Sequence, residues 1–533
     1  MTGRPTFVPD GMNPAALHPI IYVRGYAMTR GEIDETTADP FCGFNVGSTV
    51  YRATPERRRP ARKFIFESPV VRLGKDFGYR DVYVDGEDLV DNAEENLGIP
   101  RQSIVIYRYY ESASSLLGTG ETPDVGSFAT GLGALIQRVR DRVVAADSGM
   151  DPEAFRCYLV AHSMGGLVCR AFLQNPTCDP ANARRYVDKL FTYATPHNGI
   201  DMAGANVPGW LSLNDINNFN RGTMAKYLDL EEMFRTTKRV DWLPEERFPS
   251  EKVFCLIGTN RADYEAGQGL SRTFAGDGSD GLVRIEDALV TGTQDGKPST
   301  PTAKAFVYRS HSGYFGIVNS EEAYQNLVRF LFGDIRVDIW LDLEAITLPD
   351  DVQAKADEGK QVDALYQFEL LASPRGKLWY LSRRVAEEDS VACLRHQEWI
   401  KPETRPASLY LSSLFLANRS KVNPDRRSLA YSMTLGIRVP DYEVDRRLWI
   451  NEHYEGGYVY RDSVVIELFP PEQEGGEWRV AHDWQSDNVG KAETPLPARA
   501  LEAGKIELRI PFASSKTPGA TGCVRCVVGR WNA

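Results

Sequence analysis

Ser163 lies in the segment AHSMGG, residues 161–166, and is the residue from which covalent chemistry could start. A serine hydroxyl is a weak nucleophile alone, so it needs a base to take its proton and an acid to orient that base. The apolar run before Ser163 and the helical spacing after it predict a strand, a sharp turn and a helix. Such a turn requires small residues on both sides of the serine, which this segment supplies.

His311 is the predicted base among the seven histidines of the chain. It follows the strand-like run KAFVYRS and precedes the helix-like run SEEAYQNLVRFLFG. For the acid, the segment GDGSDGLV lies between the serine and this histidine, and we choose Asp280, with Asp277 as the competitor. Serine, then acid, then histidine is a known chain order for a catalytic triad.

Two backbone N–H groups are predicted to stabilise the oxyanion that forms when a serine attacks a carbonyl. One belongs to Met164, at the N-terminus of the predicted helix, where the helix dipole favours negative charge. The other belongs to Tyr26, which follows Arg24 and Gly25 at the end of an early strand-like run. Many hydrolases have a histidine where this chain has Arg24, but the role belongs to the backbone.

Ala161 departs from the G-x-S-x-G pattern of serine hydrolases, because it stands where the first glycine is expected. It adds one methyl group to the turn, whereas Gly165 and Gly166 are retained. Since an acid and a histidine follow in the expected order, we interpret the segment as a variant of the same turn.

Together, AHSMGG, ATPHNG, SDGLV and a late histidine before a helix resemble bacterial lipases and esterases of the α/β-hydrolase family. The resemblance covers about residues 15 to 335, and small Bacillus-type lipases share the alanine. It implies Ser163 as nucleophile, Asp280 as acid, His311 as base, and Tyr26 and Met164 as the oxyanion hole. We expect no cofactor and no metal ion, although some lipases of this kind bind a structural calcium near the acid loop, and that alternative stays open.

The elements that must position these residues alternate between strand-like and helix-like segments. The strand-like runs are 19–25, 103–110, 156–162, 189–195, 252–259 and 304–310, and the helix-like runs are 127–146, 167–175 and 320–333. This alternation predicts an α/β fold with a mostly parallel sheet over residues 1–334. After residue 335 short alternating strands, such as RVDIWLDLEAI, predict an all-β, sandwich-like domain over residues 335–533.

Residues 200–250 are predicted to form a cap or lid inserted in the first domain, because they are rich in large apolar residues. Trp210 and Leu211 are candidates to line an acyl pocket, and simple packing on the sheet is the alternative. His197, in ATPHNG, is expected to shape the floor of the substrate pocket. A basic segment, RATPERRRPARK, is interpreted as a solvated loop, with contact to an anionic head group as the alternative.

Composition narrows the class of partner. The net charge of −11 disfavours nonspecific binding to nucleic acid. No apolar run approaches the length of a membrane helix, and the first residues lack the apolar stretch of a secretory signal, so a cytoplasmic location is expected unless export is signal-independent. The eight cysteines are scattered, and Cys523 and Cys526 are expected to be reduced thiols in a last strand.

The function predicted from the sequence is a serine carboxylic ester hydrolase of the lipase, phospholipase or esterase type. An acyltransferase or amidase with the same triad is one alternative, and a non-catalytic binding protein of this fold is another. The expected partner is an ester or lipid substrate. For the C-terminal domain, contact with a lipid surface or a protein stays open, and so does the oligomeric state.

Overall fold

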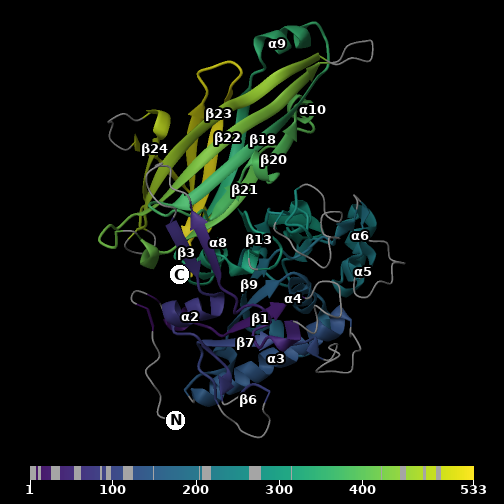
Figure 1. The fold of residues 1–533 in the computed structure, drawn as a ribbon, viewed down its shortest axis with the longest axis vertical. Helices are drawn as coiled ribbons and strands as arrows, with labels where there is room; N and C mark the ends of the chain where they lie inside the picture. Colours follow the sequence, from purple (N-terminus) through teal and green to yellow (C-terminus); the bar gives the residue numbers. More distant parts are fainter. Residues whose placement is uncertain are drawn as a thin grey trace. The chain divides into compact units, whose positions relative to one another are not determined.

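The computed structural model describes residues 8–9, 12, 14–25, 36–52, 62–84, 87–91, 98–111, 124–147, 149–202, 205–206, 218–262, 278–313, 315–421, 423–444, 452–471, 476–487 and 494–532. The chain divides into two compact units (Figure 1). The first comprises Met1–Lys304 and Tyr308–Phe332, and the second comprises Ala305–Val307 and Gly333–Ala533.

A seven-stranded sheet forms the centre of the described part of the first unit. Its strands, in spatial order, are β4 (Arg80–Asp81), β7 (Ser103–Tyr107), β1 (Ile20–Arg24), β8 (Cys157–His162), β9 (Val187–Tyr193), β13 (Val253–Gly258) and β16 (Ala303–Val307), of which only Ala303 and Lys304 are assigned to the first unit. The pairs from β4 to β13 are all parallel. Strands β8 and β13 are buried at every residue, as expected for a parallel sheet that is covered on both faces. The first unit therefore has the α/β fold with a mostly parallel sheet that the sequence predicts.

Helices cover both faces of this sheet. Helices α2 (Pro69–Phe77) and α8 (Glu321–Phe332) share one face, and α3 (Val125–Ala146) and α4 (Met164–Gln174) share the other. The strand register separates the two faces: Tyr158 pairs with Lys189, whose ammonium donates to the carbonyl of Leu331 on α8. Tyr107 projects the opposite way and donates to the carbonyl of Phe128 on α3. The sheet is thus the middle of three layers.

A two-stranded hairpin lies in the long segment between β1 and α2. Strands β2 (Ser48–Arg52) and β3 (Arg62–Phe66) pair antiparallel, with Thr49 opposite Ile65. An ideal Cβ on Gly47 would lie 2.1 Å from the carbonyl oxygen of Glu67, so only glycine lets the two chain segments approach this closely. Smaller pairings are β5 (Tyr83–Val84) with β6 (Glu87–Asp88) and β10 (Asp201–Met202) with β11 (Ala205–Asn206).

The described part of the 200–250 segment belongs to the first unit. It contains α5 (Arg221–Tyr227), α6 (Glu231–Thr237) and β12 (Trp242–Pro244), and β12 pairs with β14 (Thr291–Gln294), which pairs with β15 (Lys297–Pro301). Gln174, at the end of α4, donates to the carbonyl of Leu228, and Met224 and Leu228 are fully buried. Trp210 and Leu211, the predicted pocket-lining residues, lie outside the described residues.

The second unit consists of two antiparallel sheets. The first follows the order β21 (Leu409–Leu416), β17 (Ile335–Ile346), β28 (Ala520–Arg530), β27 (Ile506–Ala513), β26 (Ala498–Ala500). The second follows β19 (Ser382–Arg384), β18 (Val362–Pro374), β22 (Leu429–Val444), β23 (Glu452–Phe469), β24 (Arg479–Trp484), β25 (Thr494–Pro495), and β20 (Ala392–Arg395) also pairs with β18. Helices α9 (Asp350–Asp357) and α10 (His396–Ile400) complete it. Buried residues of both sheets, such as Ile339 and Tyr431, form one core, the arrangement expected of a sandwich.

Two further findings concern membrane-spanning helices and the C-terminal cysteines. None of the helices in the described part of the chain is long and apolar enough to cross a membrane. Cys523 and Cys526 lie in β28 as free thiols, and burial raises the pKa of both, to about 11 and about 12. Since they are three residues apart in a strand, their side chains point to opposite faces and cannot share a ligand.

We predict that Gly165→Ala destabilises the first unit by roughly 3 kcal/mol, because an ideal Cβ there lies 2.0 Å from the carbonyl oxygen of Val23. Chemical unfolding would measure the loss. Gly149→Ala is the matched control, since the nearest atom to its Cβ would be at an ordinary 3.6 Å. Equal stability of the two variants would show that β1 does not hold the start of α4 this closely.

Candidate active site

Ser163 occupies the turn between β8 and α4 with φ 55° and ψ −131°. A positive φ is unfavourable for a residue with a side chain and persists only where the surroundings enforce it. Here the N–H of Ser163 donates to the carbonyl of Tyr193 at 3.0 Å, and its carbonyl accepts from Thr195 Oγ at 2.9 Å. The neighbouring strand β9 and the residues after it therefore hold the serine in this conformation.

The glycines around the turn allow β1 and the start of α4 to touch. An ideal Cβ on Gly25 would lie 2.4 Å from the nitrogen of Met164, and one on Gly166 would lie 2.1 Å from Thr195 Oγ. Ala161 needs no such freedom, because it sits inside β8, fully buried, and pairs with Val23 and Thr192. The extra methyl group of the variant motif is therefore accommodated in the sheet.

Ser163, His311 and Asp280 form one line of hydrogen-bonding distances. His311 Nε2 lies 2.9 Å from Ser163 Oγ, and His311 Nδ1 lies 2.9 Å from Asp280 Oδ2. The three residues come from separate loops that follow β8, β16 and β13, and each is at most 3% exposed. This arrangement can move a proton from the serine to the histidine while the carboxylate keeps the imidazole oriented.

Asp280 is fixed by its own loop. Its Oδ1 accepts from the N–H groups of Leu282 and Val283 at 3.0 and 2.8 Å, which leaves Oδ2 for His311. The N–H of His311 also donates to the carbonyl of Asp280 at 3.0 Å. The competing candidate, Asp277, lies outside the described residues.

His162, next to the serine, contacts the loop that carries His311. Its Nε2 lies 2.8 Å from the carbonyl oxygen of His311, and the two rings are 5.0 Å apart. Burial lowers the pKa of His162 well below its usual value, with Arg24 and His311 acting in the same direction. His162 is therefore neutral with its proton on Nε2, because only that nitrogen faces an acceptor. Sequence reasoning did not identify this contact.

The oxyanion-hole candidates are placed in part. Met164 begins α4, so its N–H is one of those that lack a partner within the helix. Tyr26 lies outside the described residues. Gly25, which precedes it, donates its N–H to the carbonyl of His162 at 2.8 Å and packs against Met164.

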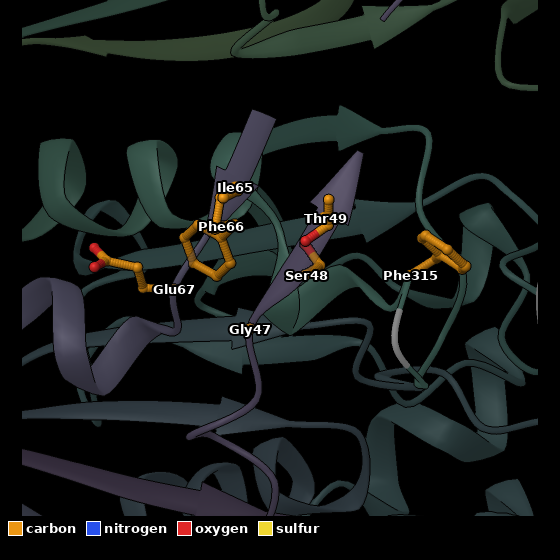
Figure 2. A pocket seen from close by; sticks show the side chains of 7 residues that line it. All are labelled: Gly47, Ser48, Thr49, Ile65, Phe66, Glu67 and Phe315. Atoms are coloured by element: carbon orange, nitrogen blue, oxygen red, sulfur yellow. The ribbon is translucent and has the colours of Figure 1, made fainter. Parts of the chain in front are cut away.

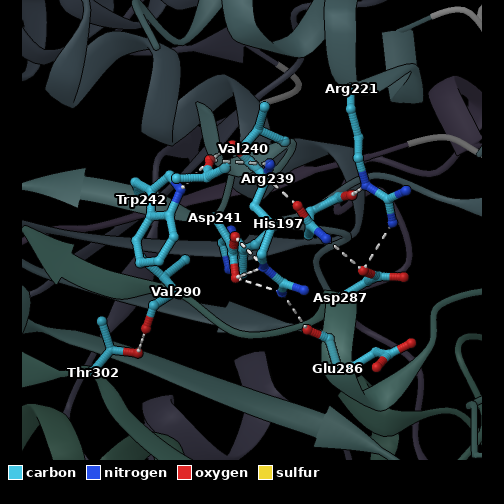
Figure 3. A network of polar contacts seen from close by, with 12 residues as sticks. His197, Arg221, Arg239, Val240, Asp241, Trp242, Glu286, Asp287, Val290 and Thr302 are labelled. Carbon is cyan, nitrogen blue, oxygen red and sulfur yellow. Dashed lines mark hydrogen bonds and ion pairs between the residues drawn. The ribbon is translucent and has the colours of Figure 1, made fainter. Parts of the chain in front are cut away.

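His197 is fully buried and lies in a network of polar contacts (Figure 3). Its Nε2 lies 3.2 Å from Thr192 Oγ, and burial, with Arg170 nearby, lowers its pKa well below the usual value. The carbonyl of His197 accepts from Arg170, whose guanidinium also donates to the carbonyls of Val240 and Trp242. The structure thus places His197 in a buried network that ties α4 to the 200–250 segment.

Asp287 joins the same network (Figure 3). Its Oδ1 accepts from Asn198 Nδ2 at 2.8 Å and lies 3.2 Å from a guanidinium nitrogen of Arg221, which also pairs with Asp201. Burial raises the pKa of Asp287 to about 6, although Asn198 and Arg221 act in the opposite direction. Asp287 lies seven residues after Asp280, so this cluster anchors the far end of the acid loop.

A group of side chains with metal-ligand chemistry lies in the second unit. Among the described residues, Asp441 and Glu443 on β22 and His453 on β23 bring their ligand atoms within 4.8 Å of one another. All three are solvent-accessible, and His453 Nδ1 lies 3.7 Å from a carboxylate oxygen of Asp441 and 3.8 Å from one of Glu443. Nothing in this cluster resembles a buried, enclosed site.

Comparisons with known proteins connect the chain to lipases. No family model matches it. It is 31% identical over 122 residues to triacylglycerol lipase 2 of Saccharomyces cerevisiae, a stretch that covers 22% of this chain and 35% of the yeast protein. The chain thus matches about a third of the length of that relative.

Two solved structures are also similar. Phospholipase PlaB from Legionella pneumophila is 15% identical, with 82% of this chain and 92% of that chain covered and a TM-score of 0.28. PlaB in complex with thio-NAD is 14% identical, with 82% and 89% covered and a TM-score of 0.29.

We predict that the free energy of unfolding of Asp287→Asn, measured relative to that of the wild type, increases as the pH rises. Because the folded state raises the pKa of this carboxyl from 3.8 to about 6, it binds the proton more tightly than the unfolded chain does. Wild-type stability from this group is therefore present below pH 4 and lost as the pH rises through 6. Between these limits the difference amounts to about 3 kcal/mol.

Chemical unfolding of both proteins from about pH 4 to about pH 7 would measure this difference. Asp295→Asn, at an exposed position in the turn between β14 and β15, is the control. A pH-independent difference between Asp287→Asn and the wild type would contradict the assignment.

Proposed function

We propose that this chain is a serine hydrolase of carboxylic esters that acts on lipid esters. The observation that carries the proposal is the line of two 2.9 Å contacts that joins Asp280, His311 and Ser163. The similarity of part of the chain to a triacylglycerol lipase supports lipid esters as the substrate class. All three side chains come from turns at the end of strands, where ligands bind in α/β sheets.

In the proposed mechanism, His311 Nε2 takes the proton of Ser163 as Oγ bonds to the ester carbonyl carbon. The N–H groups of Met164 and Tyr26 stabilise the oxyanion, and Asp280 stabilises the imidazolium. The carbon–oxygen bond to the alcohol then breaks, and His311 gives its proton to the leaving oxygen. Water, activated by His311, attacks the acyl-serine, and the carboxylic acid and free Ser163 are released.

Acyl transfer to an alcohol and amide cleavage use the same acyl-serine, so they differ from hydrolysis only in the nucleophile or the leaving group. Product analysis with an added alcohol acceptor separates these reactions. A non-catalytic role is disfavoured by the hydrogen-bonding line itself, since a binding protein has no need to keep the serine and the imidazole at 2.9 Å.

We predict that Ser163→Ala lowers kcat for a p-nitrophenyl ester by at least about 10⁴-fold, because the nucleophile is lost. The variant should keep the wild-type unfolding temperature, since the hydrogen bond of Ser163 Oγ among the described groups is the one with His311. Labelling by a fluorophosphonate should disappear with the activity. Retained turnover would show that another residue is the nucleophile.

We predict that His162→Leu lowers kcat by about tenfold with little change in KM, because the carbonyl of His311 loses its donor. His162→Gln, whose amide nitrogen can take the place of Nε2, should recover most of the rate. Steady-state kinetics on the three proteins, each normalised to folded protein, provides the test. Equal rates in the leucine and glutamine variants would refute this positioning role.

A further inference from the structure

A groove of about 570 Å³ lies between the hairpin β2–β3 and the loop after His311 (Figure 2). Ile65 and Phe66 of β3 line one side, and Phe315 lies across from them. Ile65 is 62% exposed and Phe315 is 49% exposed, which is unusual for two large apolar side chains that share one hollow. The volume falls in the range of small-molecule sites.

The chemistry of the lining favours an uncharged, apolar guest. The carboxylate of Glu67, at the edge of the groove, is paired with the ammonium of Lys75 at 2.8 and 2.9 Å. The hydroxyl of Ser48 donates to the carbonyl of Asn319 at 3.0 Å. The charged group and this hydroxyl are thus already engaged, whereas Ile65 and Phe315 present apolar surface to solvent. An alkyl chain that covered them would remove this surface from water.

The groove is joined to the turn that carries the candidate base. Phe315 is four residues after His311, and the turn between them is closed by the N–H of Ile317, which donates to the carbonyl of Ser310 at 2.8 Å. Asn319 links the two sides of the groove. Its side-chain amide donates to the carbonyl of Gly313, and its main-chain carbonyl accepts from the hydroxyl of Ser48. A guest in the groove would therefore contact Phe315, which lies on the loop that carries His311.

From this placement we propose that the groove between hairpin β2–β3 and Phe315 binds the alkyl tail of the ester substrate. The proposal rests on the proposed ester hydrolysis and deepens it, because it assigns medium- and long-chain esters as the preferred substrates. The hairpin, rather than the 200–250 segment, then supplies the selectivity for chain length.

The test compares kcat/KM for p-nitrophenyl dodecanoate and p-nitrophenyl acetate in the wild type and in the Ile65→Ser/Phe315→Ser double variant. The dodecanoate-to-acetate ratio of kcat/KM should fall by about tenfold, because the substitutions remove apolar contact equivalent to the burial of roughly two methylene groups. Val71→Ser, at a 42% exposed position of α2 outside the groove, is the control and should keep the wild-type ratio. An unchanged ratio in the double variant would overturn the proposal.

A second measurement does not depend on catalysis. Binding of the fluorescent fatty acid cis-parinaric acid is measured in Ser163→Ala and in the same protein with both groove substitutions. The dissociation constant should rise about tenfold with the substitutions, and equal binding would overturn the groove assignment. If the wild type hydrolyses neither ester, the proposed function fails, and the fatty-acid measurement still decides whether the groove binds an alkyl chain.

Discussion

The contact between the end of β1 and the start of α4 is the constraint on which the candidate site depends. Gly25 and Gly165 bring these two backbones so close that no side chain fits between them. This contact confines the turn at Ser163, whose positive φ costs about 1–3 kcal/mol and has to be held by its surroundings. The turn is fixed on one side by β1 and on the other by Tyr193 and Thr195, and in this conformation Ser163 Oγ lies 2.9 Å from His311 Nε2.

The neighbouring histidines His162 and His311 have different electrostatic roles. His162 is neutral and donates its proton to the carbonyl of His311, so it adds no positive charge beside a ring that becomes cationic in the proposed mechanism. Asp280 Oδ2 lies 2.9 Å from Nδ1 of that ring, and two backbone N–H groups keep the second oxygen of Asp280 occupied. Burial of all three groups strengthens these interactions, because little solvent is present to screen them.

Much of this could be predicted from local patterns. The apolar strands separated by helical runs gave the parallel sheet, with boundaries within a few residues: the segment 156–162 became Cys157–His162 and 320–333 became Glu321–Phe332. The order of Ser163, Asp280 and His311 identified residues that the structure brings within hydrogen-bonding distance. The hairpin β2–β3 was missed because the charge-rich segment RATPERRRPARK, which links and overlaps its two strands, was interpreted as a solvated loop. The contact of His162 with His311 could not be predicted, since it joins residues 149 positions apart through a single carbonyl.

Arg170 attaches the 200–250 segment to the first unit through buried hydrogen bonds, which a removable lid would not make. Its guanidinium is buried, its pKa is lowered to about 10 by that burial, and two of the carbonyls that satisfy it belong to Val240 and Trp242. A shortened chain without these carbonyls would leave a cation in the interior with unmet donors. Removing the 200–250 segment from the first unit would therefore require Arg170 to be replaced by an apolar residue in the same step.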